Sequence, residues 1–137
     1  MSGERSKVKV QKPSGGQLSR YYVKWIRDAA KSAYNKKSYC EICGITEELD
    51  FHHFYSVSEL VHAWERINGQ VKSDEEAIAE RDRFIEQHKY ELFEATVTLC
   101  NPHHMKLHSI YGKNPKLSTA KKQESWVRIQ REKYGLV

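Results

Sequence analysis

The chain has 137 residues, of which 23 are Lys or Arg and 18 are Asp or Glu, giving a net charge of +5. A chain of this length most simply forms one domain with a modest core, which a structural metal would help to stabilise. It has no apolar run near the roughly 18 residues that a membrane-spanning helix needs, and its basic start is unlike a signal peptide. These properties exclude a membrane helix and predict a soluble, intracellular, cytoplasmic protein.

The charges are unevenly distributed along the chain. Residues 1–39 hold ten Lys and Arg against two acidic residues, residues 41–100 hold five against fourteen, and residues 101–137 hold eight against two. Two basic ends suit a polyanion such as DNA, because Lys and Arg displace its condensed counterions. The alternative is that these charges form solvated faces that only keep the protein in solution. The residues expected to contact DNA are Lys7, Lys9, Lys12, Arg20, Lys24, Arg27, Lys113, Lys116, Lys121, Lys122 and Arg128.

The N-terminal part is expected to contain a flexible arm and a helix. Residues 1–16 are basic and end in a Pro-Ser-Gly-Gly stretch, which favours an arm that orders, if at all, on a ligand. Residues 17–36 are expected to form an amphipathic helix with a basic outer face, because apolar residues recur there at helical spacing. Those apolar residues are Leu18, Tyr22, Trp25, Ala29 and Ala33.

A strand and an acidic helical insert are expected in the middle of the chain. Residues 48–54 are short and apolar enough for a strand, and helices are expected at residues 56–67 and 73–93. Each helix starts with a serine followed three residues later by a glutamate, which is a capping box. This insert, about residues 56–93, is expected to buttress the core or to bind a protein partner. The residues expected to face inward are Val57, Leu60, Val61, Trp64, Ile67, Ile78, Phe84, Ile85 and Leu92, with His88 as a core histidine.

The last third is expected to hold a strand, a short helix and a basic helix. Residues 95–99 are β-branched, which favours a strand. For the short helix, Asn101 is a suitable N-cap, Pro102 suits the first helical position, and Gly112 suits the residue just past the end. The basic helix is expected at about residues 118–134.

All three cysteines and one histidine have the spacing of a structural zinc site. Cys40 and Cys43 stand three apart, and so do Cys100 and His103, as in tetrahedral zinc sites. A zinc finger that pairs Cys40 and Cys43 with two later histidines is disfavoured, because such fingers leave only about a dozen residues between the pairs. A redox role is also disfavoured, since the chain lacks the βαβ pattern that usually surrounds a redox Cys-x2-Cys.

Four further histidines suit a second site. His104 and His108 lie four apart on one helix face, close enough to hold one ion. His52 and His53 are adjacent on a strand and point to opposite faces, so they are expected to differ in role. If His52 faces the helix, it completes a three-imidazole site with the open positions that a catalytic metal needs. His53 is then free to deprotonate a water beside a metal-bound phosphate.

The order Cys-x2-Cys, Phe-His-His and Thr-Leu-Cys-x2-His-His-x3-His resembles the HNH endonucleases, and among them the zinc-knuckle phage and homing-type enzymes. The resemblance covers about residues 39–112 and implies a ββα-metal fold, in which two strands and a helix grip a divalent ion. It implies that His53 is the general base. The metal ligands that it implies are His52, His104 and His108 for a catalytic Mg²⁺, Mn²⁺, Ni²⁺ or Zn²⁺, and Cys40, Cys43, Cys100 and His103 for structural zinc.

Two features depart from the pattern of that family. Ala95 occupies the position where the family usually has its central Asn, so the support that this carboxamide gives must come from elsewhere. In addition, the acidic insert lies where the smallest members of that family have a shorter loop.

The expected protein is therefore α+β and mostly helical, with one domain over residues 17–137 around an HNH core that carries a structural zinc site and the two-helix insert. The expected activity is metal-dependent hydrolysis of DNA phosphodiester bonds, by nicking or double-strand cleavage, in a host cell if the enzyme is phage-encoded. Two alternatives stay open at this point. One is a non-catalytic, zinc-stabilised DNA-binding module, and the other is a structure-selective nuclease directed by a protein partner.

Overall fold

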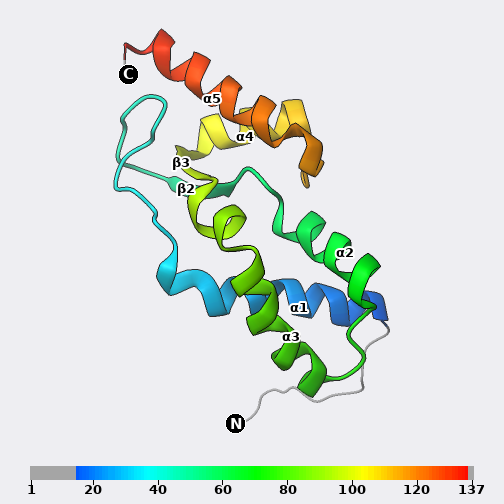
Figure 1. Ribbon diagram of the computed structural model, residues 1–137. Coiled ribbons are helices and arrows are strands. Elements are labelled where there is room, and N and C mark those ends of the chain that lie inside the picture. Colours follow the sequence, from blue (N-terminus) through cyan, green and yellow to red (C-terminus); the bar gives the residue numbers. More distant parts are fainter. Residues whose placement is uncertain (1–14, 136–137) are drawn as a thin grey trace.

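A computed structural model describes residues 15–135 and shows helices at both ends of a two-stranded sheet (Figure 1). The expected α+β class is confirmed, while nearly all of the predicted arm lies outside the described residues. Within the described part, no helix combines the length and the apolar character of a membrane span. The elements in chain order are α1 (Gly15–Ala30), the 3-10 turn η1 (Lys31–Ala33), β2 (Leu49–His53), α2 (Val57–Asn68), α3 (Asp74–Gln87), the π-helical turn η2 (Tyr90–Glu94), β3 (Thr96–Cys100), α4 (Asn101–Tyr111), the 3-10 turn η3 (Leu117–Thr119) and α5 (Ala120–Lys133).

The sheet pairs β2 with β3 in antiparallel register, so that His52 lies opposite Val97. Both predicted strands are therefore confirmed. Because α4 starts directly after β3, it folds back and packs against both strands. Two strands that are distant in sequence and one helix thus form a ββα unit.

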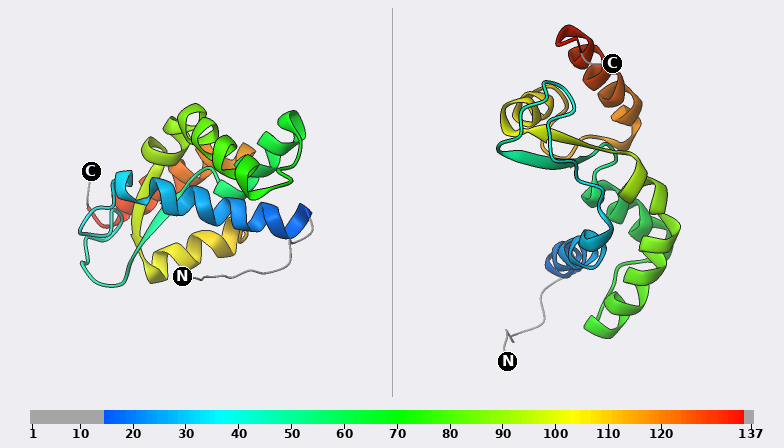
Figure 2. Two further views of the ribbon diagram at one scale, coloured as in Figure 1. Left: turned by 90° about the horizontal axis from the view of Figure 1, so that it is seen from below. Right: turned by 90° about the vertical axis from the view of Figure 1, so that its left-hand side faces the viewer.

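The helical insert packs on α1 and forms a core with it. Tyr22 and Ile26 of α1 are fully buried, and the ring of Phe84 from α3 lies edge-on to both Tyr22 and Trp64. Figures 1 and 2 show α1, α2 and α3 grouped at one end of the molecule, with α4 and α5 at the other. The insert therefore buttresses α1, which is one of the two roles expected for it.

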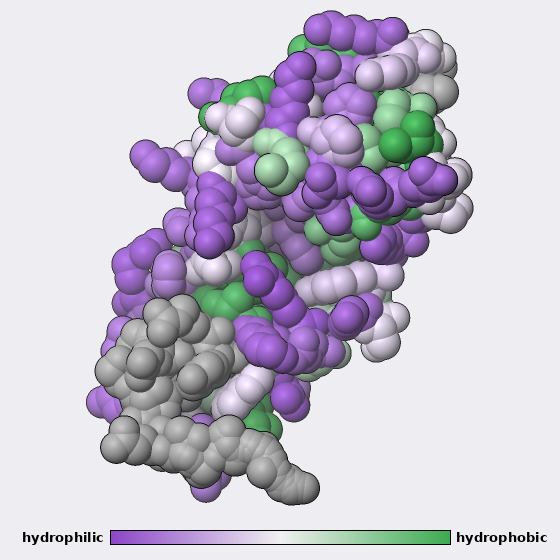
Figure 3. Space-filling model, turned by 180° about the vertical axis from the view of Figure 1, so that it is seen from behind, coloured by the Kyte–Doolittle hydropathy of each residue, from purple (hydrophilic) through white to green (hydrophobic). Residues whose placement is uncertain are grey.

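A second core lies between the ββα unit and α5. Its buried side chains include Ile42, Leu99, Leu107 and Val127, and the partly buried Tyr55 packs against both cores. On the face seen in Figure 3, hydrophilic residues predominate and hydrophobic residues form separate small patches. Most of the buried apolar side chains thus belong to these two cores.

The predicted helix over residues 73–93 ends early. After α3 the chain makes the π-helical turn η2, in which the Ala95 N–H donates to the Tyr90 carbonyl at 2.9 Å. This turn is wider than an α-helical turn and leaves Leu92 fully buried. It brings the chain to the start of β3.

Some of the predicted inward-facing residues are exposed. Ile78 is 49 % exposed, because α3 buries Ala77 and Phe84 instead. Ile67 is 83 % exposed, since it lies in the last turn of α2 beyond the buried positions of that helix. His88, predicted to be a core histidine, is only partly buried and packs at the edge of the core, with its ring 4.7 Å from that of Phe84. Also exposed are the predicted apolar positions Ala29 and Ala33.

Candidate active site and metal sites

A cleft of about 570 Å³ opens between the C-terminal end of α1 and helix α4. His52 and His53 from β2 and His104 and His108 from α4 all line it. The structure therefore brings the four histidines of the predicted second site to one cavity. Four basic residues also line the cleft, namely Arg27, Lys31, Lys36 and Lys113.

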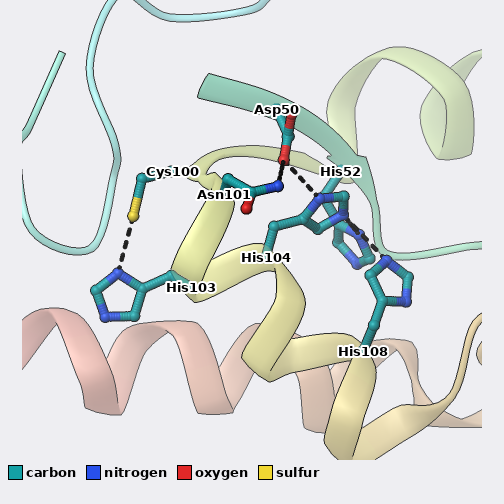
Figure 4. Close-up of polar contacts among 7 residues, drawn as sticks. All are labelled: Asp50, His52, Cys100, Asn101, His103, His104 and His108. Carbon is teal, nitrogen blue, oxygen red and sulfur yellow. Dashed lines mark hydrogen bonds and ion pairs between the residues drawn. The ribbon is translucent and has the colours of Figure 1, made fainter. Parts of the chain in front are cut away.

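Three of these histidines turn their rings toward a common point (Figure 4). His104 Nε2 lies 3.2 Å from His52 Nδ1 and 3.0 Å from His108 Nε2. These ligand atoms all lie within 4.8 Å of one another, which is the spacing of donors that share one ion. The register of β2 against β3 and the i, i+4 spacing on α4 bring them together.

The opposite nitrogen of each ring is bound to another protein group. His104 Nδ1 donates to Asp50 Oδ2 at 3.1 Å, and His108 Nδ1 donates to the Gly112 carbonyl at 2.7 Å. His52 Nε2 lies 2.8 Å from Gln123 Oε1. A ring nitrogen that donates outward leaves the other with its lone pair directed inward. The three imidazoles therefore form a donor set that fits one divalent transition-metal ion.

Burial favours the neutral form of two of these imidazoles, His52 and His104. His52 is only 3 % exposed, and burial lowers its pKa to about 3, although the contact with Gln123 acts in the opposite direction. Burial also lowers the pKa of His104, against the hydrogen bond to Asp50. Neutral rings retain the lone pairs that a metal ion would need.

Both ends of α4 help to place its ligands. The N-cap is Cys100, one residue before the predicted Asn101, because the extended backbone of β3 runs directly into the helix. The Asn101 side chain instead donates to Asp50 Oδ2 at 3.3 Å. Gly112 ends the helix as predicted, with a φ of 95° that favours glycine. Its N–H donates to the His108 carbonyl at 2.8 Å, while its own carbonyl accepts from the ring of His108.

His53 points to the other face of β2 and has different surroundings. Its ring lies 5.0 Å from that of Tyr34, edge to face, and a ring N–H donates to the Leu92 backbone carbonyl. Among the described residues, His53 Nε2 is buried without a hydrogen-bond partner. Burial and, to a lesser extent, the nearby Arg27 guanidinium together lower the pKa of His53 to about 4, against the hydrogen bond to the Leu92 backbone. His53 is thus a neutral imidazole that lines the cleft, and its Nε2 is buried and unpaired among the described residues.

The four predicted zinc ligands also meet. Ligand atoms of Cys40, Cys43, Cys100 and His103 lie within 4.8 Å of one another and can hold a metal ion. Cys100 Sγ lies 3.2 Å from His103 Nδ1 and 3.9 Å from Cys43 Sγ. Figure 4 shows His103 and Cys100 directed away from the three-histidine group. The two groups of ligands therefore share α4 but do not share ligands.

Two hydrogen bonds between Glu41 and Thr98 hold the Cys40–Cys43 turn against β3. The Glu41 N–H donates to the Thr98 carbonyl at 2.9 Å, and the Glu41 carboxylate accepts from the Thr98 N–H at 2.8 Å. Burial alone would raise the pKa of Cys40, but hydrogen bonds from backbone N–H groups, that of Ile42 among them, outweigh it and lower the pKa. Burial raises the pKa of Cys100 to about 11. A metal ion would deprotonate that thiol on binding.

Comparison with known families matches residues 15–136 to the phage T5 nicking endonuclease family. The match spans most of the chain and includes every residue of both ligand groups. The chain belongs to the nicking endonuclease family. Membership implies DNA endonuclease activity and therefore DNA as a partner. No solved structure matches the chain.

In this nicking endonuclease, the cleft contains only some of the basic residues predicted to contact DNA. Arg27 and Lys113 line it, and Lys31 and Lys36, which the sequence prediction omitted, lie there as well. A continuation of the basic face of α1 could have indicated Lys31. Exposed outside the cleft are Lys24, Lys116, Lys121, Lys122 and Arg128. The predicted contacts that fall outside the described side chains are Lys7, Lys9, Lys12 and Arg20.

Two residues that contact the three-histidine group were missed from the sequence. Asp50 lies two residues before His52, and alternation along a strand could have placed both on the same face. Gln123 comes from α5, far along the chain, and a lone glutamine in a basic helix carries no recognisable signal. Both contact metal-ligand candidates through hydrogen bonds.

Proposed function

We propose that this chain is an HNH-type, divalent-metal-dependent nicking endonuclease that hydrolyses one DNA strand, with its chemistry in the four-histidine cleft. The observation that carries the proposal is that a three-imidazole donor set and a neutral, unpaired His53 face one basic cleft. The phage T5 family match supports a nuclease and is consistent with action on DNA inside a host cell. The homing-type part of the resemblance finds no further support.

His53 is the proposed general base. The hydrogen bond between its ring and the Leu92 backbone holds the ring, and Nε2, which has no partner among the described residues, is the proposed acceptor. Because burial keeps the ring neutral, Nε2 can take a proton from a water in the cleft as that water attacks phosphorus. Tyr34 lies next to it, and its hydroxyl, also buried without a partner among residues 15–135, can donate to the same water or to a phosphate oxygen.

His52, His104 and His108 are the proposed ligands of the catalytic metal. A divalent ion bound there would stabilise negative charge on the scissile phosphate and on the leaving oxygen. Imidazole nitrogen donors suit Zn²⁺, Ni²⁺ and related ions better than Mg²⁺, which prefers oxygen ligands. The donor set therefore favours the transition-metal ions among the candidates.

The basic residues of the cleft provide phosphate contacts. Arg27 lies on the His53 side, since its guanidinium acts on the His53 pKa, whereas Lys113 follows α4 on the side of the metal ligands. These contacts position a DNA backbone without reading its sequence. The acidic face of α3 has the opposite charge and is expected to stay away from the DNA.

Cys40, Cys43, Cys100 and His103 are proposed to bind a structural Zn²⁺. Three thiolates and one imidazole form a closed tetrahedral set, which leaves no position for a substrate. Tyr134 at the end of α5 lies 3.5 Å from His103 Nε2 and can hold that ring by its outer nitrogen. This ion would fix the N-terminal end of α4, from which His104 reaches into the cleft.

The proposal is tested by incubating supercoiled plasmid with the protein in Ni²⁺, Mn²⁺, Mg²⁺ or EDTA. Wild type is expected to produce open-circular DNA with Ni²⁺ or Mn²⁺ and none with EDTA. His104→Ala should lower the nicking rate at least 100-fold, whereas His62→Ala, an exposed histidine of α2, should leave it unchanged. A protein that shifts DNA in a gel but never nicks with any metal would be a binding module, and the proposed function would be wrong.

A further inference from the structure

Gln123 is the buried polar side chain of α5. It lies in the first turn of that helix and is 0 % exposed, although α5 is otherwise rich in charged residues. Its amide contacts three groups: the ring of His52 at 2.8 Å, the Phe54 carbonyl at 3.1 Å and the Thr119 hydroxyl at 3.0 Å. The contact between this buried amide and a metal-ligand candidate needs an explanation.

The partners of Gln123 determine which way its amide points. The Phe54 carbonyl can only accept a hydrogen bond, so the amide end that faces it must be the NH₂ group. The amide oxygen then faces His52 Nε2, which must carry a proton to donate to it. A neutral His52 protonated on Nε2 has its lone pair on Nδ1, the atom that faces His104.

We propose that Gln123 is a positioning residue that holds His52 in the tautomer that binds the catalytic metal. The inference rests on the proposed function, because it takes the three-histidine group as a metal site. Gln123 fixes both the ring and the backbone next to it, since Phe54 directly follows β2.

The hydrogen bonds of His104 and His108 show why His52 needs its contact with Gln123. His104 and His108 donate to a carboxylate and a backbone carbonyl, both within or next to the ββα unit. For His52, Gln123 is the corresponding acceptor, and it lies outside the unit. Removing one such outer-shell partner typically costs about 10- to 100-fold in metal affinity. Helix α5 is therefore part of the metal site as well as part of the core.

The test measures Ni²⁺ affinity by titration calorimetry on zinc-loaded protein. Gln123→Met keeps the length of the side chain but removes both hydrogen-bonding ends, and it should weaken Ni²⁺ binding about 10- to 100-fold. Gln123→Glu retains an acceptor for His52 but loses the donor to the Phe54 carbonyl, so it should weaken Ni²⁺ binding less than Gln123→Met does. Gln130→Met makes the same change on a less buried position of α5 and should leave Ni²⁺ affinity unchanged.

A second measurement does not depend on the variants folding. In ¹⁵N NMR spectra of zinc-loaded wild type without Ni²⁺, His52 should be protonated on Nε2 and unprotonated on Nδ1. A His52 protonated on Nδ1, or a folded Gln123→Met with wild-type Ni²⁺ affinity, would overturn the proposal. If Ni²⁺ affinity falls as expected but wild type never nicks DNA, the positioning role stands and the proposed function fails separately.

Discussion

His52 and His53 are neighbours in β2, yet their rings have different partners. His52 faces α4 and α5, where one nitrogen meets Gln123 and the other meets the remaining imidazoles. His53 faces Tyr34 and Phe51, with ring centroids 5.0 and 5.2 Å away. Because alternate side chains of a strand point to opposite faces, one short stretch can supply both a metal ligand and a base. Two adjacent histidines can thus have different proposed roles, one on each face of the strand.

The low pKa of His53 predicts a specific pH dependence of stability. The folded protein keeps His53 neutral down to about pH 4, whereas the unfolded chain takes up a proton near the usual pKa of 6.5. Between these values the unfolded state binds more protons, so the free energy of unfolding falls as the pH falls. Wild type should lose up to about 1.4 kcal/mol per pH unit relative to His53→Gln between pH 6 and pH 4.

Urea denaturation of both proteins at several pH values measures this difference. His62→Gln serves as the control, because His62 is an exposed histidine of α2. Parallel curves for wild type and His53→Gln would show that His53 titrates normally in the folded protein, against its proposed neutral state.

Helix α4 is the element on which both metal groups depend. Its first turn carries His103 and His104 on different sides, and its last turn carries His108 next to Gly112. The positive φ of Gly112 turns the chain so that its carbonyl returns to the ring of His108. The residue that ends the helix is therefore also the outer partner of a proposed metal ligand.

Gly112→Ala is expected to lower both stability and metal affinity. An added Cβ meets no atom within 4 Å, so the cost is backbone strain at a φ of 95°, about 1–2 kcal/mol. Relief of that strain moves the carbonyl away from His108, and Ni²⁺ affinity should fall severalfold in calorimetry.

Gly69→Ala is the matched control for this change. Gly69 ends α2 with a φ of 85°, and its added Cβ also meets no atom within 4 Å. It should lose similar stability while keeping wild-type Ni²⁺ affinity. Equal Ni²⁺ affinities for the two variants would mean that the Gly112 carbonyl does not support the site.

The elements with strong local signals could be predicted from the sequence. Serine caps, the Cys-x2-Cys and His-x3-His spacings and Gly112 are short-range features, and the structure has the corresponding helices, ligand groups and helix end. The break after α3 has no such signal, because the π-helical turn depends on how Leu92 packs in the core. Gln123 was missed for a similar reason, since its contacts with His52 and Phe54 exist only after α5 has packed.

At the scale of the whole molecule, the cleft lies between parts of the chain that belong to two different cores. Helix α1 belongs to the core that it forms with the insert, and α4 belongs to the core that it forms with β3 and α5. The cleft takes residues from both, with Arg27 on one side and the α4 histidines on the other. The geometry of the site therefore depends on the stability of both cores.

The proposed zinc ion should be essential to the second core. Cys43→Ser removes one ligand beside buried Cys40 and Cys100, and zinc binding contributes folding free energy directly. The variant is expected to lose bound zinc and to melt without a cooperative transition.

Metal content by emission spectroscopy and thermal melting by circular dichroism check the zinc prediction. Ser38→Ala, an exposed serine shortly before the Cys-x2-Cys turn, should retain zinc and melt like wild type. Full zinc content and a wild-type melting curve for Cys43→Ser would remove the structural role of this group.

The most direct measurement of the central claim is the single-turnover nicking rate of His53→Ala with and without added imidazole. Loss of a general base should lower the rate by about 10²- to 10⁴-fold, and free imidazole should restore part of it. Ni²⁺ affinity should stay at the wild-type value, because His53 is not among the three proposed ligands. A variant that nicks plasmid as fast as wild type, at the same Ni²⁺ occupancy, would contradict the assignment of His53 as the base in this cleft.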